Sequence, residues 1–129
     1  MADTHPLLTL EQIALVAIGG FAGSNLRYFA SLVLPGLPGT LLVNVLGSFA
    51  LGFILYEATA SDLLSGKTRL VVGTGFISSF TTYSTFVVQS ATASPLLLVG
   101  NVLGTYALGF GAVLVGRATA NRVDGGDVA

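Results

Sequence analysis

The sequence predicts an all-α integral membrane protein with four spanning helices, formed by residues 1–129 as a single domain. Hydrophobic residues occupy 53% of the 129 positions and charged residues only 9%, whereas soluble domains carry about 25% charged residues. No charged residue or histidine occurs between Arg27 and Glu57, or between Arg69 and Arg117. A soluble fold could not cover its surface with the few polar side chains that remain. Because one span needs roughly 20 apolar residues, the chain has room for about four.

The four spans are predicted by apolar runs that turn-forming residues separate. Proline and glycine mark the turn after the first span, and Pro95 closes the turn before the fourth. Segments this long satisfy their backbone hydrogen bonds in lipid only as helices. The predicted spans cover residues 10–34, 40–56, 69–89 and 96–115, and a disordered tail is predicted over residues 118–129.

Basic residues predict an orientation for the four spans. An even number of spans places both termini and the loop over residues 57–67 on one side of the membrane. The basic residues of that side are Lys67, Arg69, Arg117 and Arg122, against Arg27 on the other. The positive-inside rule therefore predicts cytoplasmic termini in a cell membrane. A net charge of −1 gives no indication of a nucleic-acid partner.

Hydroxyl side chains are concentrated in the third span. Seven of the eight residues from Ser78 to Thr85 carry a hydroxyl, and they lie all around the helix instead of along one face. Such a segment is either surrounded by protein or broken at mid-membrane, where hydroxyls and water satisfy the freed backbone groups. A broken helix would expose backbone groups that can bind ions.

Polar side chains in the other spans are few. Asn44 shares a helix face with Thr40, and it is expected either to form a hydrogen bond between helices or to line a pathway. Arg27 needs a partner, an aqueous vestibule or a position at the membrane surface. Seventeen glycines predict close helix packing, within the chain or against a second chain.

No arrangement of residues typical of a catalytic site occurs, so the chain is not predicted to be an enzyme. An uncharged polar pathway is better suited to conduction than to pumping, which usually needs a titratable group inside the membrane. A small drug/proton antiporter that uses Glu11 is one alternative, although the chain contains no tryptophan for a substrate wall. A non-transporting assembly partner is another.

Three motifs occur in order, one in each of the first three spans. They are GGFAGSNLRY (Gly19–Tyr28), GTLLVNVLGSF (Gly39–Phe49) and GFISSFTTYSTF (Gly75–Phe86). They resemble the GGxxGxxxRY, GTLxVNxxGSF and GFxGGLTTFSTF signatures of the CrcB/Fluc fluoride channels. The resemblance covers essentially the whole chain.

The resemblance implies a broken third helix, an antiparallel dimer and passive, fluoride-selective export from the cytoplasm that relieves fluoride toxicity. The implied fluoride pathway consists of Asn44, Tyr83, Phe86, Thr40, Ser84, Thr85 and Tyr106. A structural sodium ion at the dimer centre is implied to bind the backbone carbonyls of Ser78 and Thr81. Arg27 matches an arginine with a vestibule or structural role.

This chain departs from the family pattern within the third span. Ser78 and Ser79 replace two glycines, Tyr83 replaces a phenylalanine, and Gln89 replaces a common glutamate. Family members assemble either with themselves or with an inverted paralogous subunit. Most basic residues lie on one side of the membrane, and the third motif is altered. We therefore expect either a homodimer or a heterodimer with an inverted paralogous subunit.

Overall fold

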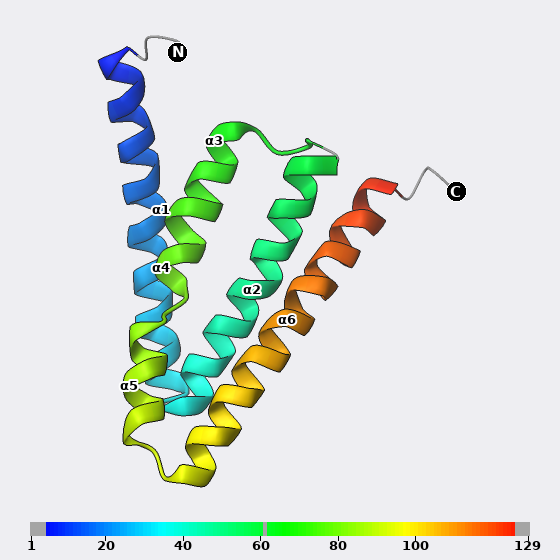
Figure 1. Cartoon of the computed structure of the whole chain (residues 1–129). Coiled ribbons are helices and arrows are strands. Elements are labelled where there is room, and N and C mark those ends of the chain that lie inside the picture. Colours follow the sequence, from blue (N-terminus) through cyan, green and yellow to red (C-terminus); the bar gives the residue numbers. More distant parts are fainter. Residues whose placement is uncertain (1–4, 61, 126–129) are drawn as a thin grey trace.

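Four long helices make up a computed structural model that describes residues 5–60 and 62–125 (Figure 1). They are α1 (Pro6–Val33), α2 (Leu37–Ala60), a third span over Gly66–Thr92 and α6 (Pro95–Gly125). Each is long and apolar enough to cross a membrane, and the described part of the chain contains no strand. The prediction of an all-helical protein with four spans is confirmed.

The third span is not one regular helix. It consists of α3 (Gly66–Arg69), the π-helix η1 (Leu70–Ile77), α4 (Ser78–Phe80) and α5 (Ser84–Thr92). Between α4 and α5 the chain leaves the helix, because Thr81 is extended with φ −83° and ψ 162°. The predicted break is therefore present within the hydroxyl-rich stretch. The π-helix was not predicted; π-helical turns are rare and often occur at functional sites.

The helices extend beyond the predicted boundaries. α1 begins at Pro6, where the His5 Nδ1 atom accepts a hydrogen bond from the Leu7 amide at 3.2 Å and proline occupies the first turn. α6 continues to Gly125, which corrects the disordered tail predicted from residue 118. Neither proline nor glycine interrupts residues 118–124, so nothing in the sequence stops the helix there. Residues 126–129 lie outside the described part.

The spans pack as two pairs, α1 against the third span and α2 against α6. Glycines bring the backbones of each pair into contact. A Cβ atom at Gly19 or Gly23 would overlap carbonyl oxygens of η1, and one at Gly52 would overlap the carbonyl oxygen of Val113 on α6. The predicted role of small residues in helix packing is confirmed within the chain.

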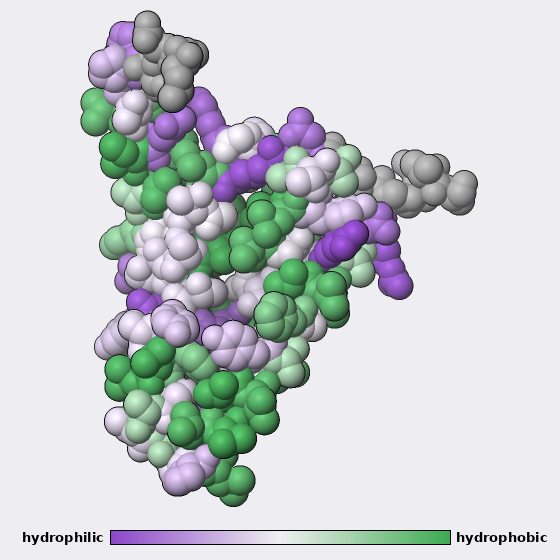
Figure 2. Space-filling view, viewed as in Figure 1, coloured by the Kyte–Doolittle hydropathy of each residue, from purple (hydrophilic) through white to green (hydrophobic). Residues whose placement is uncertain are grey.

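The outer surface is mainly apolar. Large side chains such as Phe21, Leu96 and Phe110 are exposed, at 75%, 84% and 69%. Figure 2 shows hydrophobic atoms above and below a paler band that crosses the middle of the molecule. Both ends of the described chain and α3 lie at one end of the bundle, and the turns after α1 and before α6 lie at the other. This distribution is that of a multi-pass membrane protein.

Candidate functional site

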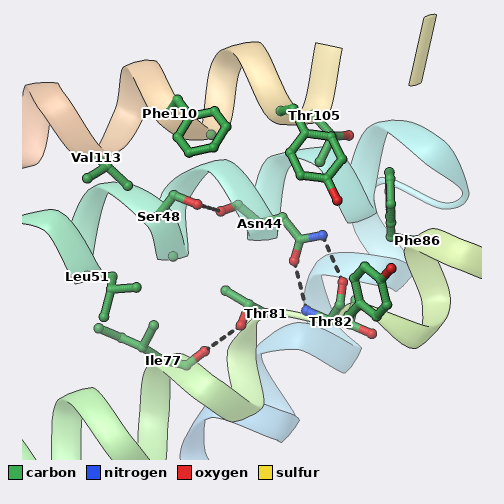
Figure 3. Close-up of a pocket in the computed structure, with 14 residues that line it drawn as sticks. Asn44, Ser48, Leu51, Ile77, Thr81, Thr82, Phe86, Thr105, Phe110 and Val113 are labelled. Carbon is green, nitrogen blue, oxygen red and sulfur yellow. Dashed lines mark hydrogen bonds between the residues drawn. The ribbon is translucent and has the colours of Figure 1, made fainter. Parts of the chain in front are cut away.

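The break in the third span is held by the side chain of Asn44 on α2 (Figure 3). The Asn44 Nδ2 atom donates a hydrogen bond to the Thr82 carbonyl oxygen at 2.9 Å, and the Thr82 amide donates one to Asn44 Oδ1 at 2.8 Å. One carboxamide thus pairs both backbone groups of Thr82 where the helix stops. Of the two roles predicted for Asn44, the hydrogen bond between helices is present in the structure.

The Thr82 hydroxyl caps the second half of the span. The Thr85 amide donates to Thr82 Oγ1 at 3.2 Å, and Thr82 Oγ1 donates to Thr85 Oγ1 at 3.1 Å. The bond satisfies an amide in the first turn of α5, whose N-cap residue, Tyr83, forms no side-chain capping bond. Thr82 was not among the predicted site residues. The signal that could have identified it is a threonine at the start of an apolar helical run.

A pocket of about 360 Å³ lies beside the break, between α2, the third span and α6. Figure 3 shows Asn44, Thr82 and Phe86 on one side of it and Phe110 on the other. None of the residues that line this first pocket carries a charge. It can therefore offer hydroxyls, an amide and aromatic rings to a small ion, but no fixed counter-charge.

Four aromatic rings follow one another along the first pocket. The centroids of Tyr83 and Phe86 are 5.9 Å apart, and Phe86 meets Tyr106 at 6.2 Å with the ring planes at 85°. Tyr106 lies 6.3 Å from Phe110, which was not predicted. Phe86 is buried, whereas Tyr83 and Tyr106 are 72% and 49% exposed. The rings of Tyr83 and Phe86, both named in the pathway that the resemblance implies, thus lie next to each other.

A second pocket, of about 310 Å³, lies between α1, the beginning of α2 and α5. Arg27 lines it and donates a hydrogen bond from Nε to the Ser79 carbonyl oxygen at 3.1 Å. Gln89 also lines it, and its Oε1 atom is buried with no hydrogen-bond donor among the described residues. Thr82 lines both pockets, so the backbone of the break is common to the two.

The structure divides the predicted pathway residues between the two pockets. The first pocket is lined by Asn44, Tyr83, Phe86 and Tyr106. The second is lined by Thr40 and Thr85, and also by Arg27, for which a vestibule or structural role was implied. Ser84 lines neither; it is exposed, with its Oγ atom 3.5 Å from Thr82 Oγ1.

The carbonyl oxygens of Ser78 and Thr81 lose their usual helical donors. In a regular helix they would accept from the amides of Thr82 and Thr85. Those amides instead donate to Asn44 Oδ1 and Thr82 Oγ1. Carbonyl oxygens that have lost their hydrogen-bond donors are suitable ligands for a small hard cation. The described residues contain no group of three or more His, Cys, Asp or Glu side chains that could hold a metal ion.

Two ion-pair systems lie away from both pockets, at the end of the bundle that holds α3. Glu11 pairs with Lys67 at 2.6 Å, and its side chain is 40% exposed. Glu11 thus has a cationic partner, on α3, at this end of the bundle. Glu57, predicted to begin a loop, lies within α2 and is 2% exposed. Its two oxygens each accept from Arg69 at 3.0 Å, and Arg69 also binds Asp62 at 2.6 Å.

Comparison with known proteins gives one consistent family. The family described as "CrcB-like protein, Camphor Resistance (CrcB)" matches residues 14–117. A protein of Haloarcula marismortui named "Fluoride-specific ion channel FluC 1" is 60% identical over 126 residues, 98% of each chain. "Fluoride-specific ion channel FluC 2" of Halobacterium salinarum is 51% identical over 113 residues, which is 87% of this chain and 88% of the relative.

Proposed function

Because the chain belongs to the CrcB-like protein family, we propose that it is a fluoride-selective channel that exports fluoride from the cytoplasm and relieves fluoride toxicity. The names of the relatives support this proposal, and they confirm that the class is an ion channel rather than an enzyme. The pathway is passive, so the direction of net flow follows from the fluoride gradient.

The observation that carries the proposal is an uncharged helix break between two pockets. Fluoride is small and strongly hydrated, so it leaves water only where hydrogen-bond donors replace its hydration shell. Hydroxyls of Thr40, Thr85 and Tyr106 supply donors, and Asn44 Nδ2 has a second hydrogen that the bond to Thr82 does not use. Neutral donors hold the anion weakly enough to release it, which conduction requires.

Aromatic rings and one arginine complete the proposed pathway. The hydrogen-bearing edges of Phe86 and Tyr83 carry partial positive charge and suit an anion inside the first pocket. Among the described residues, Arg27 is the only charged one that lines either pocket. Its positive charge raises the local anion concentration in the second pocket, and Arg27 does not line the first pocket.

A structural sodium ion at the break is part of the proposal. The carbonyls of Ser78 and Thr81 would hold it, because their helical donors are engaged elsewhere. When bound, sodium would supply a positive charge that offsets the clustered oxygens. The Arg27 bond removes the Ser79 carbonyl from the set of available ligands.

We further propose an antiparallel dimer, with a second copy or with an inverted paralogous subunit, in the plasma membrane. The first pocket is open at Tyr83 and Tyr106, which are 72% and 49% exposed. No residue in the most apolar stretch of α6 is buried within the chain. A second subunit would cover these side chains. The basic residues at the α3 end favour cytoplasmic termini for this chain.

Fluoride efflux from liposomes tests the function. Purified full-length protein is expected to release fluoride but not chloride, as followed with ion-selective electrodes. Phe86→Ala should reduce fluoride efflux at least tenfold, whereas Val87→Ala, at an exposed neighbouring position, should not change it. Equal efflux from protein-free liposomes and from liposomes with the chain, alone or with an inverted partner subunit, would refute the proposal.

The same assay separates a complete channel from a non-conducting assembly partner. Efflux by the chain alone supports a homodimer with working pathways. Efflux only after co-reconstitution with an inverted relative supports a heterodimer. In that case, Phe86→Ala is introduced into this chain of the heterodimer. Reduced efflux would show that the pocket of this chain conducts, and unchanged efflux would show that only the pathway of the partner subunit conducts.

A further inference from the structure

We propose that Tyr56, Arg117 and Asn121 form a binding site for the phosphate group of an anionic membrane lipid. These residues line a pocket of about 320 Å³ between the end of α2 and α6, together with Leu114 and Ala118. None of them lines either pocket beside the helix break. The site is thus separate from the proposed fluoride pathway and does not depend on it.

The three polar side chains are held together by specific contacts. The Arg117 guanidinium lies 5.7 Å from the centroid of the Tyr56 ring, in a cation–π contact. The Tyr56 hydroxyl donates a hydrogen bond to Asn121 Oδ1 at 2.7 Å. That bond fixes the orientation of the Asn121 amide and leaves the two hydrogens of its Nδ2 atom available as donors.

The pocket offers donors and positive charge to a ligand. The ion pairs within the described side chains involve Lys67 and Arg69, so Arg117 has no carboxylate partner there. A guanidinium presents planar N–H donors that match phosphate oxygens. With the Asn121 amide beside it, the site suits a group that is anionic and accepts several hydrogen bonds, which describes a phosphate.

The position of the pocket favours a lipid over free phosphate. Arg117 is the first charged residue after the uncharged run that begins at Leu70, and Tyr56 ends the uncharged run that follows Arg27. Both residues therefore lie where the hydrocarbon region ends and headgroups begin. Leu114, one turn of α6 before Ala118, is 63% exposed and can contact an acyl chain while Arg117 binds the headgroup.

Native mass spectrometry of the full-length protein in detergent tests this site. The protein is titrated with phosphatidylglycerol or with phosphatidylcholine, and the number of lipids retained is counted. The wild type is expected to retain phosphatidylglycerol preferentially. Arg117→Gln should weaken that retention about fivefold, the effect of one basic residue worth ~1 kcal/mol near an anionic lipid surface. Arg122→Gln is the matched control, because it removes the same charge from the same helix outside the pocket.

Two further measurements distinguish binding in this pocket from a general attraction to surface charge. Tyr56→Phe keeps the ring beneath Arg117 but removes the hydroxyl that orients Asn121, so an intermediate loss of retention is expected. Inorganic phosphate should not displace the bound lipid. Equal losses in Arg117→Gln and Arg122→Gln would overturn the proposal, because they would indicate a general surface charge. Displacement by inorganic phosphate, or equal retention of both lipids, would also overturn it.

Discussion

The carboxamide of Asn44 and the backbone of Thr82 exchange two hydrogen bonds, at 2.9 and 2.8 Å, across the break in the third span. This pairing lets the chain leave the helix inside the membrane while the amide and carbonyl of Thr82 both keep a hydrogen-bond partner. It also makes one side chain on α2 responsible for the geometry of both pockets, since Thr82 lines each of them.

Removal of the Asn44 side chain is expected to destabilise the protein. Asn44→Ala leaves both backbone groups of Thr82 without partners, which should lower the free energy of unfolding by about 2–4 kcal/mol. Detergent-induced unfolding followed by circular dichroism measures this change. Asn25→Ala is the control, because among the described residues the Asn25 amide donates only to the Phe21 carbonyl oxygen of its own helix, at 2.7 Å. Equal stability of the two variants would contradict the role assigned to Asn44.

Substitution of Asn44 by aspartate should separate stability from conduction. Asn44→Asp keeps an oxygen for the Thr82 amide but loses the donor to the Thr82 carbonyl and adds a negative charge to the pocket. Fluoride efflux should therefore fall further than in Asn44→Ala, even if the protein unfolds at a higher detergent concentration. Efflux that simply follows stability across the two variants would exclude an electrostatic role for this position.

The Tyr83 hydroxyl should influence conduction more than folding. Tyr83→Phe keeps the ring and removes one hydroxyl, so it is expected to change the free energy of unfolding by less than about 0.5 kcal/mol. The ring edge remains while one donor is lost, and fluoride should leave the pocket faster. Liposome efflux is expected to rise. Slower efflux would indicate that the hydroxyl stabilises fluoride during passage instead of retaining it.

Glycines at the helix contacts should not tolerate a methyl group. A Cβ atom at Gly23 would overlap the carbonyl oxygen of Phe76, so Gly23→Ala should separate α1 from the third span and lower stability. Gly100→Ala is the matched control, since a Cβ atom there would meet no atom of the described residues within 4 Å, apart from its chain neighbours and the backbone of its own helix. Within a helix that change should stabilise the protein by about 0.5–1 kcal/mol. In the same unfolding assay, the free energy of unfolding is expected to fall for Gly23→Ala and to rise for Gly100→Ala.

The buried carboxylate of Glu57 should matter more than the exposed one of Glu11. Glu57 is 2% exposed and binds Arg69 through both oxygens, whereas Glu11 is half-exposed beside Lys67. Glu57→Gln leaves a partly buried guanidinium with a weaker partner, so its thermal midpoint should fall clearly below that of Glu11→Gln. Thermal unfolding monitored by circular dichroism compares the two. Equal midpoints would contradict a structural role for the Glu57–Arg69 pair.

Sodium removal tests the carbonyl site proposed at Ser78 and Thr81. Replacement of sodium by a large organic cation on both sides of the liposome should reduce fluoride efflux, and restored sodium should recover it. The control is the same sodium replacement on Phe86→Ala, whose efflux should already be reduced at least tenfold, so the absolute change in efflux should be small. Efflux that is independent of sodium would remove the ion from the proposal.

Residue pattern alone determined the class of this protein. The uncharged runs from Arg27 to Glu57 and from Arg69 to Arg117 require a membrane, because no soluble surface could be made from them. The hydroxyls from Ser78 to Thr85 indicated a break, since polar groups on every side of a helix have no use in lipid. The three motifs indicated the family that the comparisons confirm.

Only the tertiary structure decided which groups meet. The pairing of Asn44 with Thr82, the division of the predicted residues between two pockets, and the contact of Tyr56 with Asn121 join residues far apart in the chain. Local sequence signals reach one or two helical turns, whereas these contacts depend on how whole helices are placed by glycine packing. The ends of α1 and α6 also exceeded their apolar runs, because a helix stops at a breaker and not where hydrophobicity ends.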